Sequence, residues 1–250
     1  MEKNFENKTE ETEFELKRRG YCQQFALSHM SAFRPHYKTG ETLGKKESVW
    51  RNVSEHCLAA GVLADILAEE LRVPAEERKK VVTAMILHDW YKKHEVQMQK
   101  KSMSVETMNE VGEKEEAELL RLGIPDEIMR LMHANMPISA DGPQTTAEKI
   151  IWYVDAMLSN TEPVPIRERF DNLERGWDGS KEDPGRAWRN RAFSDMFKSR
   201  YGGQSLYDVQ RQLGDRIGAE FSEAISYTGN PSELPVLLRE KFVKKVMRKA

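Results

Sequence analysis

Two histidines and two aspartates combine side chains of the kind that bind divalent metal ions. They are His56, His88, Asp89 and Asp155. The pair His88-Asp89 ends an apolar run that begins at Met85, and Asp155 interrupts a second apolar run. A carboxylate beside a buried stripe is costly unless a cation or several donors satisfy it. Imidazole and carboxylate together form a mixed nitrogen and oxygen set, which suits Mn, Fe, Co, Ni or Zn better than calcium.

Each of these residues also has an interpretation that needs no metal. A single histidine beside an apolar face is more often a hydrogen-bonded core residue than a ligand. A buried aspartate can cap a helix or pair with an arginine. The complete set, carried by successive helical segments, favours a metal site over these separate explanations.

Three predicted helices carry the four residues. Apolar residues recur every three or four positions over residues 48–73, which predicts one helix, and Pro74 starts the next at its first turn. Thr145 and Glu148 match a capping box, in which a hydroxyl and a carboxylate satisfy free backbone N–H groups, and this predicts a helix through Leu158. No stretch alternates apolar and polar residues between turn signals. The fold class is therefore predicted to be all-α.

Further helices are predicted on both sides of these three. The segments with helical patterns are 104–122, 125–133, 187–200, 205–227 and 233–249. Residues 161–190 contain several prolines and glycines and are expected to form a long connection. The acidic residues 1–16 are expected to fray or to form a solvated helix, and a loop is expected near residues 39–44.

Three runs of sequence surround the candidate ligands. They are Asn52-Val-Ser-Glu-His56, Ala84-Met-Ile-Leu-His88-Asp89-Trp-Tyr-Lys92 and Lys149-Ile-Ile-Trp-Tyr-Val-Asp155. Together they resemble the HD-domain superfamily of metal-dependent phosphohydrolases, whose pattern is H…HD…D on a helical core. The resemblance implies an HD-domain helical bundle over residues 47–160. An N-terminal arm or helix at 1–46 would pack on this core, and residues 161–250 would add a loop and a helical extension to the same globular unit.

The resemblance also implies a ligand set and a cofactor. His56, His88, Asp89 and Asp155 would bind a divalent metal ion, which would be Mn, Fe, Co, Ni, Zn or Mg. One ion per chain is expected, and a second ion that uses His133 stays open. Asp89 would in addition orient the attacking water if one of its oxygens remains free.

Further residues are candidates for catalysis and for substrate binding. Lys92 occupies the place of the lysine in the HDxxK variant and could neutralise phosphate charge, although a solvated lysine explains it equally well. His133 is a candidate acid or phosphate donor, with the alternative that it simply favours a helix C-terminus. Trp90 and Tyr91 are placed to line a pocket mouth, and Arg51 could reach the same pocket one turn before the first ligand.

Six arginines between residues 161 and 191 could bind a substrate anion. They are Arg167, Arg169, Arg175, Arg186, Arg189 and Arg191. The arginine fork matches phosphate oxygens in a two-pronged fashion. The same region contains a similar number of acidic residues, so an internally paired surface is the alternative.

The predicted function is hydrolysis of a nucleotide or another small phosphoester by a metal-activated water. Two other functions stay open. One is an oxygen-dependent di-iron HD enzyme, which needs more histidines than His94 and His133 readily supply between the HD pair and Asp155. The other is a non-catalytic HD module that binds a nucleotide or a partner.

The composition limits the remaining choices. The 250 residues include 39 Lys and Arg and 41 Asp and Glu, and the net charge of −2 gives no support for bulk nucleic-acid or membrane binding. The longest apolar run, 150–158, already contains Asp155, so no membrane span is expected. An acidic N-terminus and only two cysteines favour a reduced, cytoplasmic protein. The expected partner is a small phosphorylated substrate, with no membrane and no specific nucleic acid, while homo-oligomerisation stays open.

Overall fold

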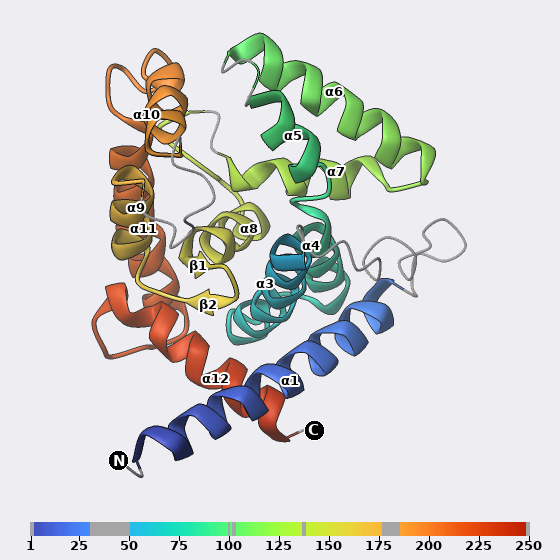
Figure 1. The fold of residues 1–250 in the computed structure, drawn as a ribbon, viewed down its shortest axis with the longest axis vertical. Helices are drawn as coiled ribbons and strands as arrows, with labels where there is room; N and C mark the ends of the chain where they lie inside the picture. The colour runs from blue at the N-terminus through green and yellow to red at the C-terminus, as the bar shows by residue number, and fades with distance from the viewer. Residues whose placement is uncertain are drawn as a thin grey trace.

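The computed structural model describes residues 3–30, 51–99, 101, 104–136, 139–176 and 186–248. Over these residues the chain is almost entirely helical (Figure 1). The elements are α1 (Lys3–Met30), α3 (Arg51–Glu70), α4 (Ala75–Leu87), α5 (Lys92–Gln99), α6 (Val105–Arg121), α7 (Asp126–Met132), η2 (His133–Asn135), α8 (Thr146–Met157), β1 (Leu158–Ser159), β2 (Glu162–Pro163), α9 (Ile166–Glu174), α10 (Arg186–Phe197), α11 (Leu206–Ala224), η3 (Pro231–Glu233) and α12 (Leu234–Arg248). The predicted all-α fold class is confirmed.

Helices α3, α4 and α8 form the centre of the molecule (Figure 1). Their apolar residues are almost completely buried, as Leu63, Met85 and Ile151 illustrate. Gly61 lets α3 approach α4 closely, because a Cβ atom at this position would lie 2.7 Å from Ile86 Cγ1. This close approach brings the first turns of α3 beside the end of α4, where His88 follows the helix.

The start of α8 confirms the predicted capping box. Thr145 accepts a hydrogen bond from the backbone N–H of Glu148, and the Glu148 carboxylate accepts one from the backbone N–H of Thr145. Farther along α8, the indole of Trp152 donates to Gln210 Oε1 of α11 at 2.7 Å. Because both groups are buried, this bond satisfies two polar atoms that would otherwise be costly. It ties α8 to the C-terminal helices.

The N-terminal helix α1 crosses α12 and packs on α3 (Figure 1). Arg18 is 2% exposed and pairs with Glu15 on its own helix and with Glu55 of α3. Phe14 meets Phe242 of α12 edge to face. The helical alternative for residues 1–16 is therefore the one adopted from Lys3 onward, and the helix continues to Met30. The loop expected near residues 39–44 lies outside the described residues.

The predicted connection at 161–190 contains a helix, which corrects that expectation. Pro165 is the residue before the first turn of α9 and has a backbone conformation that permits a helix to begin. Helix α9 is held on α11 by Arg211, which pairs with Asp171 and Glu174. Asp171 and Glu174 are far from Arg211 in sequence. The prolines and glycines of this segment are local turn signals, so they could not indicate these long-range contacts. Helix α5 was not predicted either, because its eight residues are mainly polar.

None of the helices in the described ranges is both long enough and apolar enough to cross a membrane.

Candidate metal centre

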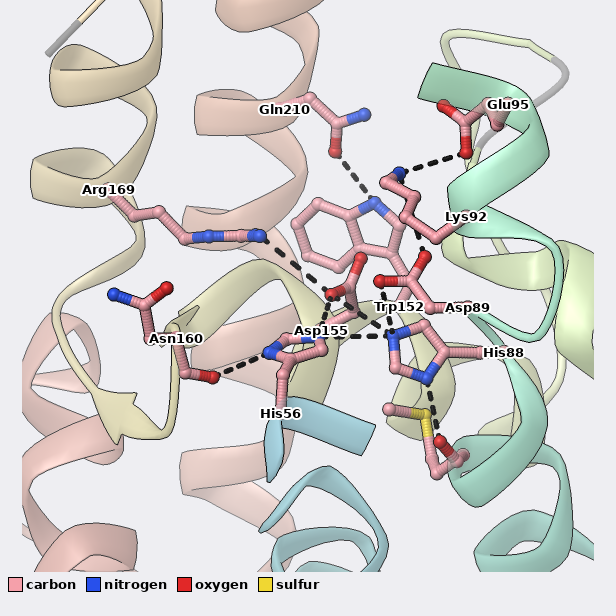
Figure 2. A network of polar contacts seen from close by, with 11 residues as sticks. His56, His88, Asp89, Lys92, Glu95, Trp152, Asp155, Asn160, Arg169 and Gln210 are labelled. Atoms are coloured by element: carbon pink, nitrogen blue, oxygen red, sulfur yellow. Dashed lines mark hydrogen bonds and ion pairs between the residues drawn. The ribbon is translucent and has the colours of Figure 1, made fainter. Parts of the chain in front are cut away.

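His56, His88 and Asp155 meet at the centre of the bundle (Figure 2). His56 lies in the second turn of α3, His88 directly follows α4, and Asp155 lies in the last turn of α8. His56 Nε2 is 3.2 Å from His88 Nε2 and 3.2 Å from Asp155 Oδ1. His88 Nε2 is 3.5 Å from the same carboxylate oxygen. Three ligand-type atoms from three helices therefore form a compact triangle.

Backbone carbonyls fix the orientation of both imidazoles. His56 Nδ1 donates to the carbonyl oxygen of Asn160 at 2.6 Å, and His88 Nδ1 donates to that of Met85 at 2.7 Å. A carbonyl oxygen only accepts hydrogen bonds, so each Nδ1 must carry the proton. In the neutral rings both Nε2 atoms then present lone pairs to one another and to Asp155. Metal-binding histidines commonly donate their other N–H group in this way.

The carbonyl of Asn160 reaches His56 through a tight hairpin. Strands β1 and β2 pair in antiparallel register with Leu158 opposite Pro163, which leaves Asn160 and Thr161 at the turn. Asn160 has φ 56°, a left-handed conformation that asparagine tolerates better than most residues. Asn160 was not predicted as a site residue. Its only signal was an asparagine soon after the predicted helix, because the group that matters is a backbone carbonyl.

The spacing of the three atoms fits a common metal ion. Atoms bound about 2.1 Å from one ion lie about 3.0 Å apart in octahedral and about 3.4 Å apart in tetrahedral arrangements. The distances of 3.2, 3.2 and 3.5 Å fall close to this range. Two imidazole nitrogens and a carboxylate oxygen are suitable ligands for Mn, Fe, Co, Ni or Zn. The residues therefore form a candidate metal site.

Electrostatics at the triangle favour a positive charge. Burial would raise the pKa of Asp155, but Arg169 and the two histidines outweigh it and hold this pKa well below its usual range. Burial would lower the pKa of His88, but Asp89 and Asp155 outweigh it and raise the pKa to about 9. Without a metal, a proton on His88 supplies part of the charge that these acceptors require. A cation shared by the three atoms would supply it more completely.

Asp89 lies beside the triangle. Its Oδ2 atom is 3.9 Å from His88 Nε2, and Asp89, His88 and Cys57 form a second group whose ligand-type atoms lie within 4.8 Å of one another. Burial raises the pKa of the Cys57 thiol well above its ordinary value, so the thiol stays protonated. The two groups share His88. The structure thus brings the other three predicted ligands, together with Cys57, around the imidazole of His88.

Charged residues surround Asp89 on its outer side (Figure 2). Lys92 Nζ lies 3.6 Å from Asp89 Oδ1 and 3.0 Å from Glu95 Oε2. Burial lowers the pKa of Lys92, but Asp89 and Glu95 outweigh this effect and raise it, so the amine is charged. Burial, followed by the charges of Glu95 and Asp89, raises the pKa of Glu115 on α6 to about 7. Glu95 and Glu115 were not predicted, since acidic residues on polar helices are too common to indicate a site.

The other predicted residues occupy different surroundings. Trp90 is partly buried against the core, and Tyr91 stacks on the exposed His94 with ring centroids 4.3 Å apart. His133 is exposed on η2 and belongs to neither group of ligand-type side chains. Arg51 is the first residue of α3, and its side chain lies outside the described part of the structure.

Comparisons with known proteins do not assign the chain to a family. No protein-family model matches it, and searches of curated proteins and of solved structures each found no match. The function must therefore be inferred from the chemistry of the site itself.

Proposed function

We propose that the chain is a metal-dependent phosphohydrolase with an HD-type helical core, which hydrolyses a nucleotide or another small phosphoester. The single observation that carries this proposal is the convergence of three buried lone-pair atoms on a point between α3, α4 and α8. Both imidazoles are oriented by carbonyl oxygens, so that in the neutral rings both Nε2 atoms can bind a cation. An arrangement of this kind is suited to a divalent cation.

The proposed roles follow from position. His56, His88 and Asp155 would hold the ion. A bound divalent ion would lower the pKa of a coordinated water and polarise a phosphoryl oxygen. Asp89 Oδ2 lies 3.9 Å from His88 Nε2, and Asp89 Oδ1 lies 3.6 Å from Lys92 Nζ. Because both distances exceed that of a hydrogen bond, the carboxylate can still accept one from the attacking water.

The charges around Asp89 suit an anionic substrate. Lys92 carries a charged amine next to the candidate site and would neutralise part of the phosphate charge. Its second partner, Glu95, holds the amine in place without removing its charge. His133 receives no role, because its side chain is exposed and is not grouped with the candidate ligands.

The direct test is phosphate release from a panel of nucleotides and small phosphoesters with Mn, Co, Ni, Mg or Fe(II). The wild-type protein should release phosphate only when a metal is present, and Asp89→Ala should reduce the rate at least about 100-fold. Lys79→Ala is the control, because Lys79 is exposed on α4, the helix that precedes Asp89, and pairs only with nearby Glu76 in the described structure. Absence of release with every metal, or equal release by Asp89→Ala, would contradict the proposal.

A further inference from the structure

Arg169 brings a guanidinium group to the candidate metal site from α9. Its side chain is 19% exposed, and one of its terminal nitrogens lies 3.8 Å from Asp155 Oδ1. This distance exceeds the 2.7–3.2 Å of a direct N–H···O hydrogen bond. Among the described residues its other contact is the face of Phe170, 5.6 Å from the ring centroid. Within the described ranges, no carboxylate therefore lies at hydrogen-bond distance from the five N–H donors of this largely buried group.

The other arginines near Arg169 have partners of their own. Arg167, two residues earlier on α9, pairs with Asp215 of α11. Arg175, at the end of the helix, donates to the side chain of Asn172 and to the backbone carbonyl of Asp171. The alternative of an internally paired surface therefore applies to Arg167 and Arg175 but not to Arg169.

Helix packing holds Arg169 in place without help from Asp155. Arg211 of α11 pairs with Asp171 at 2.9 Å and with Glu174 at 2.8 Å, and both acids belong to α9. Gly214 allows the two helices to approach closely, since a Cβ atom there would lie 2.6 Å from Ile166 Cγ2. The guanidinium is thus presented to the site by the scaffold, which is a favourable arrangement for a group that must bind a ligand.

We propose that Arg169 binds the phosphoryl group of the substrate, on the side of the site opposite Lys92. This inference rests on the proposed function and adds a second cationic residue to it. Figure 2 shows Arg169 and Lys92 approaching Asp155 and Asp89 from opposite sides, one from α9 and the other from α5. Once a divalent cation neutralises Asp155, the carboxylate that Arg169 faces in the described structure no longer competes for it, and the guanidinium can donate to phosphate oxygens in two-pronged fashion.

The same arrangement favours a terminal phosphate over a phosphodiester. A two-pronged arginine engages two non-bridging oxygens, and the metal and Lys92 need at least one more. A phosphomonoester or a terminal phosphate of a nucleotide offers three such oxygens, whereas a diester offers two. The substrate class is therefore a terminal phosphoryl group.

Calorimetric titration of inorganic phosphate into the Mn²⁺-loaded protein tests this role without measuring turnover. Arg169→Gln should weaken phosphate binding about 30-fold while Mn²⁺ content stays unchanged. Arg169→Lys keeps the charge but not the fork and should weaken binding about tenfold. Arg167→Gln removes an arginine from the same helix and should leave phosphate affinity within about threefold of the wild type. Dimethyl phosphate should bind at least about tenfold more weakly than inorganic phosphate.

The outcomes separate this inference from the proposed function. If Arg169→Gln binds phosphate as tightly as the wild type, or if the loaded wild type binds none, the role of Arg169 is wrong even though the metal site stands. Equal binding of dimethyl phosphate would overturn the substrate class alone. If the wild type retains no Mn²⁺, the proposed function fails. In that case inorganic phosphate is titrated into the metal-free protein. If Arg169 binds the phosphoryl group, Arg169→Gln must still weaken phosphate binding.

Discussion

The two ends of α3 each bury a carboxylate cluster, and only one of the clusters is electrostatically complete. Asp65, which is 5% exposed, pairs with Arg78 of α4 at 3.2 Å and with Lys245 of α12 at 2.7 Å. Its two oxygens each have a cation, so the cluster ties three helices together and needs nothing more. At the other end of α3, His56 Nε2 lies 3.2 Å from both His88 Nε2 and Asp155 Oδ1, and the hydrogen-bond partners of these atoms are one another.

The difference separates buried charges that serve only stability from buried groups that bind a ligand. His56 and Asp65 lie on the same helix, roughly 14 Å apart along its axis, and both clusters are enclosed by the same core. A buried charge with matched partners is explained by structure alone. A buried group of acceptors that lacks a shared cation indicates a ligand. The two clusters should therefore respond differently to the same substitution.

Asp155→Asn should weaken Mn²⁺ binding at least about 100-fold, because it removes the anionic member of the triangle. Asp65→Asn makes the same chemical change at the other end of α3 and should alter the dissociation constant by less than about threefold. Both constants can be measured by equilibrium dialysis with metal analysis. Similar losses in the two variants would mean that the two clusters are not functionally different.

The ranking should reverse for the stability of the metal-free protein. Asp65→Asn leaves Arg78 and Lys245 facing a neutral amide and should lower the free energy of unfolding by about 2 kcal/mol. Asp155→Asn should have a smaller effect, because the nearest arginine, Arg169, lies 3.8 Å from the carboxylate and because the change removes its repulsion with Asp89. Urea unfolding in the presence of chelator provides both values. A larger loss in Asp155→Asn would show that the site end also serves mainly as structure.

The excess of negative charge at the site should appear in the pH dependence of stability. The pKa of Glu115 is raised to about 7, above its ordinary value of 4.5, by burial and by Glu95 and Asp89. The folded state therefore binds this proton more tightly than the unfolded state, and the stabilisation it gives is lost as pH rises from about 4.5 through 7. Glu115→Gln should consequently be more stable than the wild type by about 1–2 kcal/mol at pH 8.5, with chelator present.

This gain should decrease as the pH is lowered and should be absent below about pH 4.5, where the wild-type carboxyl is protonated in both states. Glu116→Gln, an exposed change on the same helix, is the matched control and should show no such trend. A gain that does not depend on pH would show that Glu115 is not held in a negatively charged environment.

The smallest effect concerns the hairpin that orients His56. Asn160→Ala keeps the backbone carbonyl but places alanine in a left-handed conformation, which should cost about 1 kcal/mol of stability. Asn160→Gly should be tolerated, because glycine adopts this conformation without a Cβ penalty. Thermal unfolding of the two variants gives the comparison. Equal stability of both would show that the turn is not constrained at this position.

The sequence was sufficient to predict the elements that carry the ligands. Apolar spacing predicted α3, and the buried run that ends in His88 marked the end of α4. The capping box at Thr145 fixed the start of α8, and therefore the turn on which Asp155 lies. These signals are local, because each depends on residues within one or two helical turns.

The remaining parts of the site depend on long-range contacts and could not be predicted. The Asn160 carbonyl orients His56, and a backbone group leaves no trace in residue type. Arg169 is one of six similar arginines in the sequence, and its approach to within 3.8 Å of Asp155 depends on the packing of α9 against α11 through Arg211 and Gly214. Helix α5 presents Lys92 and Glu95, although its polar sequence gives no amphipathic pattern.

The most direct test of the central claim is proton NMR of the Co²⁺-loaded protein. Because His56 and His88 both donate Nδ1–H to backbone carbonyls, binding of Co²⁺ by both Nε2 atoms should shift two slowly exchanging N–H signals far outside the ordinary range. One signal should disappear in His56→Gln and the other in His88→Gln. If no shifted exchangeable signal appears, or if the signals persist in both variants, the triangle between α3, α4 and α8 does not bind a metal ion.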